Sequence, residues 1–364
     1  MSIENQNTLK YIRADVDPGK PGTAVELTEP KKNQTGFLKG VSMGKLSGVI
    51  IGLICVCIYL SFSNPLFLTW GNILNIFRAQ SVVFILSIGM TFVILCGMLD
   101  LSVASTTGAA AVAFGFAMKA GCSPLLTILI TLSTGVVLGL INGFLIGFGR
   151  ISWFVTTLAT LSIYASTILV LTRGSTISLF TLETFKPIQY LANQNIGPLP
   201  IILIIILMLY LVGWIILDRT VFGRAVYAVG SNPEAARLNG INVPLTLMSV
   251  YMIAGLTCSI GAIQQVGRLT AAVPTTDPNQ MLAVIAAVLI GGMSLKGGEG
   301  GLLGTFLGTL FLGVIQNGLT LQGISAFWQG TVTGFILIFA AGLAVMREIN
   351  FKSKFTRLLL HFSK

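Results

Sequence analysis

Long apolar runs separated by short polar segments follow one another from residue 46 to residue 346. Several runs hold about 17–23 residues without an acidic or basic side chain, the length at which a helix crosses a lipid bilayer. Strands of an outer-membrane barrel would instead alternate apolar and polar residues over roughly ten positions, and these runs do not alternate. We therefore predict membrane-spanning helices at 46–63, 79–99, 101–119, 124–147, 152–172, 199–217, 246–267, 280–293, 301–321 and 328–346.

The composition supports a membrane protein. Hydrophobic residues make up 54% of the 364 residues and charged residues only 9%, whereas soluble proteins carry about 25% charged residues. The predicted fold class is therefore all-α, a polytopic membrane bundle of about ten transmembrane helices. Residues 46–346 form this transmembrane domain, between a polar, largely disordered tail at 1–45 and a basic tail at 347–364.

The distribution of basic residues predicts the orientation in the membrane. Cytoplasmic segments of membrane proteins collect Lys and Arg, and the predicted topology places most basic residues, including those of both tails, on that side. Both termini are therefore expected in the cytoplasm, and the net charge of +10 reflects topology rather than nucleic-acid binding. The segments placed outside contain only Arg78, Lys119, Arg173, Lys186 and Arg268.

The reactive side chains form no catalytic or metal-binding pattern. The five cysteines lie mostly in apolar runs without disulfide or zinc spacing, and the one histidine, His361, lies in the C-terminal tail. We expect no catalytic residues and no metal site, so a membrane enzyme is disfavoured. The phosphate-binding pattern of Gly, four residues, Gly-Lys-Ser/Thr is also absent. If ATP drives this protein, a partner chain has to bind the nucleotide and its magnesium ion.

One short polar segment, GSNPEAARLNG at 230–240, lies between apolar runs. Asn232 suits the N-cap of a helix, and Pro233 suits its first position. Glu234 suits the positive helix end, and Gly240 suits the stop. Such a short helix is unstable alone in water, so we expect something to pack against it. On the cytoplasmic side it is a candidate handle by which another protein moves the spans. Its residues are Asn232, Pro233, Glu234, Ala235, Ala236, Arg237 and Gly240.

Asp100 interrupts a long apolar stretch in the segment GMLDLSVAS at 97–105. A carboxylate at membrane depth is costly unless it faces a cavity or a partner. Ser102 and Ser105 follow it, so Asp100 suits the cap of a helix that begins there. A structural cap is slightly favoured over direct contact with a substrate. A proton relay is less favoured, because neighbouring spans carry no second acid or histidine.

Glycine-rich stretches have two interpretations each. The segment LKGGEGGLLG at 295–304 is typical of a flexible inside turn with solvated Lys296 and Glu299, and such a turn also suits a gating hinge. Small residues crowd several spans, as at Gly135, Gly139 and Gly143, where they let helices approach closely. Plain packing is the favoured explanation of the span glycines.

Four blocks together resemble the membrane permease subunits of bacterial ATP-binding-cassette (ABC) importers for simple sugars, the ribose, arabinose, xylose and galactose group. The third block is the most specific, and the resemblance covers roughly residues 46–346. The chain reads Gly97-Met98-Leu99-Asp100 where the family more often has Gly-Gly-Ile-Asp. The blocks are GMLDLSVAS at 97–105, NGFLIGFGRISWFVTTLATLSI at 142–163, FGRAVYAVGSNPEAARLNGI at 222–241 and IGGMSLKGGEGGLLGT at 290–305.

The resemblance implies a complex of two permeases and two ABC ATPase subunits in the bacterial inner membrane, served by a periplasmic or lipid-anchored sugar-binding protein. It implies a permease fold similar to the type II, vitamin B12-type importers. By this match, residues 233–237 are the coupling helix that docks in a cleft of the ATPase, and Asp100 lies beside the translocation path. The second permease is either an identical copy or a sister chain.

The expected mechanism is alternating access, in which ATP binding closes the ATPases and the coupling helix moves the spans. Few polar side chains are available for a buried sugar site, so specificity would lie mainly in the binding protein. The candidate lining of the path is the set of polar side chains inside apolar spans: Asp100, Ser102, Asn142, Thr156, Thr157, Gln316 and Asn317.

Three alternatives remain open. A permease of the same superfamily could carry branched-chain amino acids, nucleosides or a signalling furanose. An ion-coupled secondary transporter is less favoured, because the spans carry a single acid and no histidine. A channel-like or scaffold role would need no ATPase.

Overall fold

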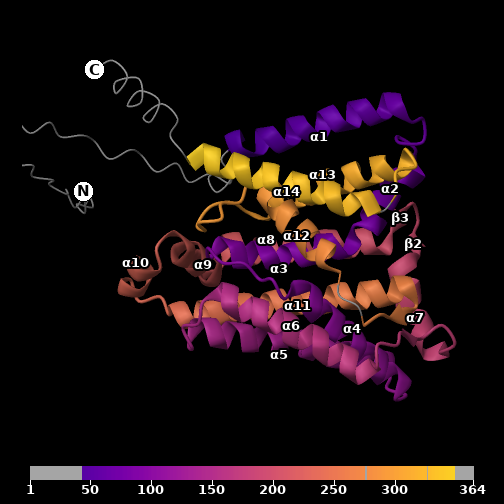
Figure 1. The fold of residues 1–364 in the computed structure, drawn as a ribbon, viewed down its shortest axis with the longest axis horizontal. Helices are drawn as coiled ribbons and strands as arrows, with labels where there is room; N and C mark the ends of the chain where they lie inside the picture. The colour runs from indigo at the N-terminus through magenta and orange to yellow at the C-terminus, as the bar shows by residue number, and fades with distance from the viewer. Residues whose placement is uncertain (1–42, 275–276, 326, 349–364) are drawn as a thin grey trace, which may run out of the picture. The chain divides into compact units, whose positions relative to one another are not determined.

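The computed structural model describes residues 43–274, 277–325 and 327–348, and this part of the chain folds into helices joined by short connections (Figure 1). The all-α prediction is confirmed. Residues 1–42 of the predicted N-terminal tail and residues 349–364 of the predicted basic C-terminal tail lie outside the described part. The helices are α1 (Met43–Ser63), α2 (Trp70–Ala79), α3 (Ser81–Leu95), α4 (Val103–Lys119), α5 (Pro124–Gly147), α6 (Trp153–Thr172), η1 (Glu183–Phe185), α7 (Lys186–Asn193), α8 (Ile201–Arg219), α9 (Val221–Ser231), α10 (Pro233–Leu238), α11 (Val243–Leu269), α12 (Pro278–Ile290), α13 (Leu302–Leu321) and α14 (Phe327–Glu348). The strands are β1 (Ile177–Ser178), β2 (Asn195–Ile196), β3 (Leu199–Pro200) and β4 (Ala271–Ala272).

Most of the predicted spans correspond to helices of membrane-crossing length. In the described residues, six helices are long and apolar enough to cross a bilayer, namely α1, α5, α6, α8, α11 and α13. Helices α2 and α3 add a seventh span if the pair, bent by 50°, is counted as one. Helix α12 has 13 residues and is therefore about 20 Å long, which is shorter than the roughly 30 Å hydrocarbon core. The run at 280–293 is thus a short apolar helix. The chain is a multi-pass membrane protein.

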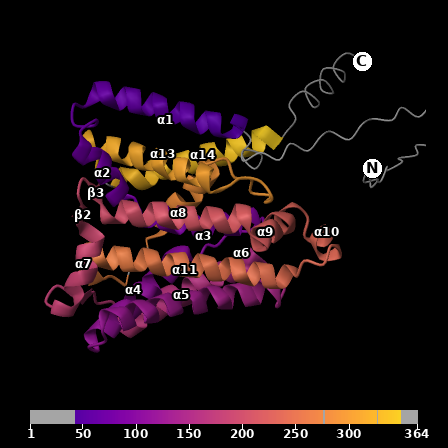
Figure 2. The same cartoon turned by 180° about the vertical axis from the view of Figure 1, so that it is seen from behind.

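Helices α3 and α11 lie at the centre of the bundle. Every residue of α3 is buried, as expected for a helix that is apolar all round. Helix α3 packs against α8, α11, α12 and α13, while α11 also packs against α4 and α5. Helices α1, α13 and α14 therefore lie on one side of α3, and α4, α5 and α6 lie on the other (Figures 1 and 2).

Helices α5 and α11 pack closely, and glycines allow this close approach. Four glycines at every fourth position of α5 face the backbone of α11. A Cβ at Gly143 would lie 2.6 Å from Met248 Cα, and one at Gly147 would lie 2.6 Å from Pro244 O. Gly135 and Gly139 approach α11 in the same way. Plain packing is therefore the structural role of these glycines, as close approach in lipid requires.

The outer helices carry large apolar side chains on their surfaces. Phe62 on α1 is 90% exposed, Val170 on α6 is 76% exposed and Met208 on α8 is 61% exposed. Surfaces of this kind are stable in contact with lipid rather than water.

Segments outside the spans gather at two opposite ends of the helices. Helices α9 and α10 lie at one end, and α7 with the hairpin β2–β3 lies at the other (Figures 1 and 2). Strand β1 pairs antiparallel with β4, and β2 pairs with β3. The segment at 173–198 contains η1, α7 and the strands β1 and β2. The segments at 173–198 and 218–245 thus lie at opposite ends of the helices (Figure 1).

Candidate functional site

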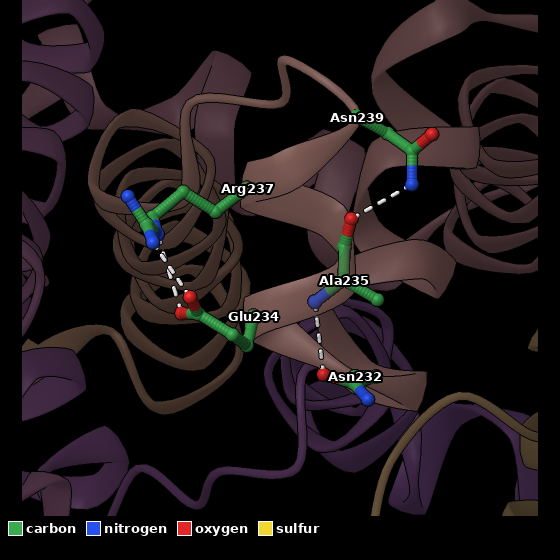
Figure 3. A network of polar contacts seen from close by, with 5 residues as sticks. All are labelled: Asn232, Glu234, Ala235, Arg237 and Asn239. Carbon is green, nitrogen blue, oxygen red and sulfur yellow. Dashed lines mark hydrogen bonds and ion pairs between the residues drawn. The ribbon is translucent and has the colours of Figure 1, made fainter.

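Helix α10 is a capped turn of six residues whose ends follow the sequence signals (Figure 3). At its start, Asn232 Oδ1 accepts a hydrogen bond of 3.0 Å from the Ala235 N–H. At its end, Gly240 adopts a φ of +81°, and the N–H groups of Gly240 and Ile241 donate to the carbonyls of Arg237 and Ala236. This pair of bonds is a Schellman motif, which only a residue tolerant of positive φ completes without strain.

The two faces of α10 differ in chemistry. Ala236 is buried against the core, whereas Leu238 is 76% exposed. On the exposed face, Arg237 donates through Nε (3.2 Å) and Nη2 (2.6 Å) to the two carboxylate oxygens of Glu234 (Figure 3). The Arg237 hydrogen bonds and positive charge lower the pKa of Glu234. Such an exposed pair adds little stability, so its value lies in the charged surface that it displays.

Helix α9, which the sequence analysis did not identify, carries α10. Thr220 Oγ1 caps it by accepting from the Gly223 N–H at 3.1 Å, and Val226 and Val229 are buried. Tyr227 donates through its hydroxyl to the Gly300 carbonyl at 2.9 Å. Burial, and then the negative charge of Asp218, raises the pKa of Tyr227 to about 12, so this hydroxyl stays protonated at neutral pH. The apolar spacing of α9 was the signal that could have located it.

Gly230 and Ser231 belong to the last turn of α9, so the short helix occupies only part of the segment at 230–240. Helix α10 packs against α9 and the start of α11. The expected packing partner of this short helix is therefore found within the chain itself.

The glycine-rich turn at 295–304 lies beside the end of α3. The Gly298 N–H donates to the Leu95 carbonyl at 2.8 Å. Lys296 and Glu299 have exposed side chains, as expected, but the turn between them is anchored to α3 and α9 through the bonds of Gly298 and Gly300.

A buried polar cluster forms where α3 ends and α4 begins. Asp100 Oδ1 accepts from the Ser102 N–H at 2.8 Å and from the Ser102 hydroxyl at 2.6 Å. Asn142 on α5 donates through Nδ2 to Ser102 Oγ at 2.9 Å. The N-cap residue of α4 is Ser102 rather than Asp100, so the carboxylate supports the turn before the helix. Asp100, Ser102 and Asn142 thus lie together, as candidates for one site would.

Two of the candidate path residues carry a buried side-chain oxygen that has no hydrogen-bond partner within the described part of the chain. These oxygens are Asn142 Oδ1 and Thr156 Oγ1, and both side chains are buried. Thr157, next to Thr156 on α6, donates to the Trp153 carbonyl at 2.9 Å. Helix α6 packs against α4 and α5. Buried polar atoms without partners are uncommon, so Asn142 Oδ1 and Thr156 Oγ1 are candidates for lining a polar path.

Gln316 and Asn317 lie elsewhere, on α13. Asn317 and Asn72 of α2 exchange two amide hydrogen bonds of 2.8 and 2.9 Å. Gln80, at the bend between α2 and α3, donates to Gln316 at 2.5 Å, and Gln316 donates to Thr333 of α14 at 3.4 Å. Helix α13 and the α4–α5 pair lie on opposite sides of α3 (Figure 1). The candidate path residues therefore form two groups, and the sequence analysis missed Asn72 and Gln80 of the second.

Within the described residues, no group of three His, Cys, Asp or Glu side chains could hold a metal ion. The candidate residues offer hydrogen bonding by hydroxyl and carboxamide groups, the buried Asp100 carboxyl group and the charged face of α10.

Comparison with known proteins places these features in a family context. A family described as branched-chain amino acid transport system / permease component matches residues 72–341. The ribose import permease of Bacillus subtilis (strain 168) is 36% identical over 293 residues, covering 80% of this chain and 90% of that protein. The ribose import permease of Escherichia coli (strain K12) is 35% identical over 295 residues, covering 80% and 91%. The galactose/methyl galactoside import permease of Salmonella typhimurium (strain LT2) is 32% identical over 330 residues, covering 85% and 96%. No solved structure matches the chain.

Proposed function

We propose an import function for this chain because it belongs to the family of permease components of branched-chain amino acid transport systems. The chain is the membrane-spanning permease subunit of an ATP-driven ABC importer that translocates a monosaccharide. The observation that carries the proposal is the 36% identity to a ribose import permease over 80% of the chain. The similar galactose permease supports a sugar over a branched-chain amino acid, a nucleoside or a furanose signal.

Helix α10 is the coupling helix of this proposal. Its buried face, at Ala236, fixes it to the permease, and its exposed face presents Glu234, Arg237 and Leu238 to the cleft of an ABC ATPase. ATP and magnesium bind to that partner, and this chain holds neither. Glu234 and Arg237 form an ion pair on this exposed face. A reversal of charge at Glu234 places two positive charges there and would therefore disrupt the contact between α10 and the ATPase.

Translocation proceeds by alternating access along polar side chains buried among apolar helices. The cluster of Asp100, Ser102 and Asn142 supplies donors and acceptors suited to sugar hydroxyls, and Thr156 and Thr157 extend the same side of the bundle. The carboxamides of Gln316 and Asn317 serve a second position of the path. Few such groups are available, so an extracytoplasmic binding protein, periplasmic or lipid-anchored, determines most of the specificity.

The proposed assembly contains a second permease, either a copy of this chain or a sister chain, and ATPase subunits on the cytoplasmic face. The protein lies in the bacterial inner membrane with both termini in the cytoplasm. In this orientation α9 and α10 face the cytoplasm, and α7 with the hairpin β2–β3 faces the binding protein.

Purification from native membranes in mild detergents, with mass spectrometry of the proteins retained, tests the proposal. We expect an ABC ATPase with the wild-type protein and its loss with Glu234→Arg. Glu183→Arg is the matched control, since Glu183 forms the same type of exposed pair with Lys186, at 2.5 Å, near α7 at the opposite end. The absence of any ATPase in several detergents would contradict the proposal and favour an ion-coupled transporter, which an ion-driven uptake assay would detect.

The transported substrate is tested separately. Uptake of labelled pentoses, hexoses, nucleosides and branched-chain amino acids is measured in cells with and without the gene. Loss of pentose or hexose uptake alone is the expected result, and loss of amino acid uptake alone would refute the sugar assignment.

A further inference from the structure

Three backbone segments that are far apart in the sequence meet at the end of α3. They are the C-terminal end of α3, the last turn of α9 and the turn around Gly298. The hydrogen bond from the Gly298 N–H to the Leu95 carbonyl, at 2.8 Å, joins two of them directly. Backbone atoms, rather than side chains, form the contact.

Glycine is required at each point of contact. A Cβ at Gly230 would overlap the Leu95 carbonyl oxygen and lie 2.6 Å from the Gly298 nitrogen. A Cβ at Gly97 would lie 2.9 Å from the Lys296 carbonyl oxygen. Real Cβ atoms do not approach backbone this closely without displacing it. We name Gly97, Gly230, Gly297 and Gly298 the glycine junction.

The glycine junction touches the segment that leads into α10. A Cβ at Gly298 would lie 2.9 Å from Ser231 Cα, and Ser231 directly precedes Asn232, the N-cap of α10. The bond from the Tyr227 hydroxyl to the Gly300 carbonyl ties α9 to the same turn a second time. If α10 moves, Ser231 moves with it and displaces the turn at 297–300 through direct contact between backbone atoms.

The other side of the glycine junction leads into the buried polar cluster. Gly97 lies three residues before Asp100, in the connection between α3 and α4. The Tyr251 hydroxyl on α11 holds this connection by donating to the Leu99 carbonyl at 3.1 Å. The α3–α4 connection thus contacts the turn at 296–297 through Gly97 and α9 through Cys96 at one end, and it carries the Asp100–Ser102 bonds at the other.

We propose that Gly230, Gly298 and Tyr227 are positioning residues that transmit the movement of α10 to the α3–α4 connection and the Asp100 cluster. The inference rests on the proposed function, because it assumes that a partner moves α10. Close-packed backbones respond to displacement by shifting together rather than by absorbing it. The glycine-rich turn then serves as a link between α10 and the path rather than as a free loop.

The test uses the complex of this chain with the ATPase that copurifies with it, reconstituted in liposomes with the binding protein and its sugar. Tyr227→Phe removes one hydrogen bond and keeps the shape of the side chain. Gly230→Ala inserts a methyl group into the glycine junction. Gly71→Ala and Gly334→Ala are matched controls, because a Cβ at either position meets no atom within 4 Å.

We expect both junction variants to retain the ATPase and its basal hydrolysis. Sugar-stimulated hydrolysis should fall about fivefold in Tyr227→Phe, the effect of one lost hydrogen bond, and about tenfold or more in Gly230→Ala. In the wild type, ATP should change hydrogen exchange at residues 95–105, and both variants should lose this response. A purely structural role would lower thermal stability and leave the response to ATP intact.

The outcomes separate the inference from the proposed function. Stimulation and exchange responses that survive in Tyr227→Phe and Gly230→Ala overturn the inference alone. A wild-type complex without any sugar-stimulated hydrolysis contradicts the proposed function and the inference with it. If Gly230→Ala fails to assemble, Tyr227→Phe decides, since it adds no atom to the packed region.

Discussion

Replacing Ala236 with Gly tests whether α10 has to be held firmly on α9 to act as a coupling helix. Ala236 is 4% exposed, and the neighbouring Ala235 is exposed, so the same substitution can be made on both faces of one helical turn. Each substitution loses about 1 kcal/mol of helix propensity. Only Ala236→Gly also removes a buried methyl group, which contributes about 0.8 kcal/mol.

The totals are about 2 kcal/mol for Ala236→Gly and about 1 kcal/mol for Ala235→Gly. These values correspond to roughly thirtyfold and fivefold increases in the population of molecules in which α10 is locally unfolded. Hydrogen exchange measures this population, since the N–H groups of Gly240 and Ile241 are protected only while α10 is folded. ATP-driven uptake should follow the same order, with Ala236→Gly the more impaired variant.

Equal acceleration of exchange in the two variants would refute the argument from burial. Impaired uptake in Ala235→Gly with normal uptake in Ala236→Gly would show instead that the exposed face alone matters. The comparison is internal, because the two variants share the same chemical change, the same helix and the same assay.

Three further predictions concern the helix packing and the polar groups. Gly143→Ala should destabilise the detergent-solubilised protein by about 1–3 kcal/mol through overpacking against α11, whereas Gly71→Ala should not; a melting temperature equal to that of wild type would contradict the packing argument. Asn317→Ala leaves the Asn72 amide without its partner and should lower the melting temperature. The double variant Asn72→Ala, Asn317→Ala should lower it by less than the sum of the two single effects; an effect equal to that sum would show that the pair is not coupled. Asn142→Ala removes one hydrogen bond and one acceptor without a partner, so its stability should change by less than about 1 kcal/mol while sugar uptake falls; unchanged uptake would exclude Asn142 from the path.

The sequence predicted the features that depend on local composition. Runs of apolar residues located the long helices, because a bilayer imposes both length and apolarity on them. The signals for capping located α10, since Asn232 and Gly240 act on backbone groups only a few residues away. The packing role of the span glycines was also predictable, because small residues have few other uses at such spacing in lipid.

Features that depend on distant contacts were not predictable in this way. Helix α9 is a different case, because its apolar spacing is a local signal that the sequence analysis did not use. The pairing of Asn72 with Asn317 joins positions 245 residues apart, and a single chain gives no signal for such a pair. The contact of Gly230 with Gly298 is equally hidden, since it depends on how α3, α9 and the turn at 297–300 meet.

The glycines of α5 have an evolutionary consequence that follows from their geometry. Gly139, Gly143 and Gly147 approach backbone atoms of α11 rather than side chains. Selection therefore restricts the two helices differently, because α5 has to keep its glycines whatever side chains α11 carries, whereas Tyr251 of α11 is restricted by its own burial and its bond to Leu99. A library of single substitutions should accordingly find α5 intolerant along one stripe, and Met248 of α11, which that stripe meets only through its backbone, open to many replacements.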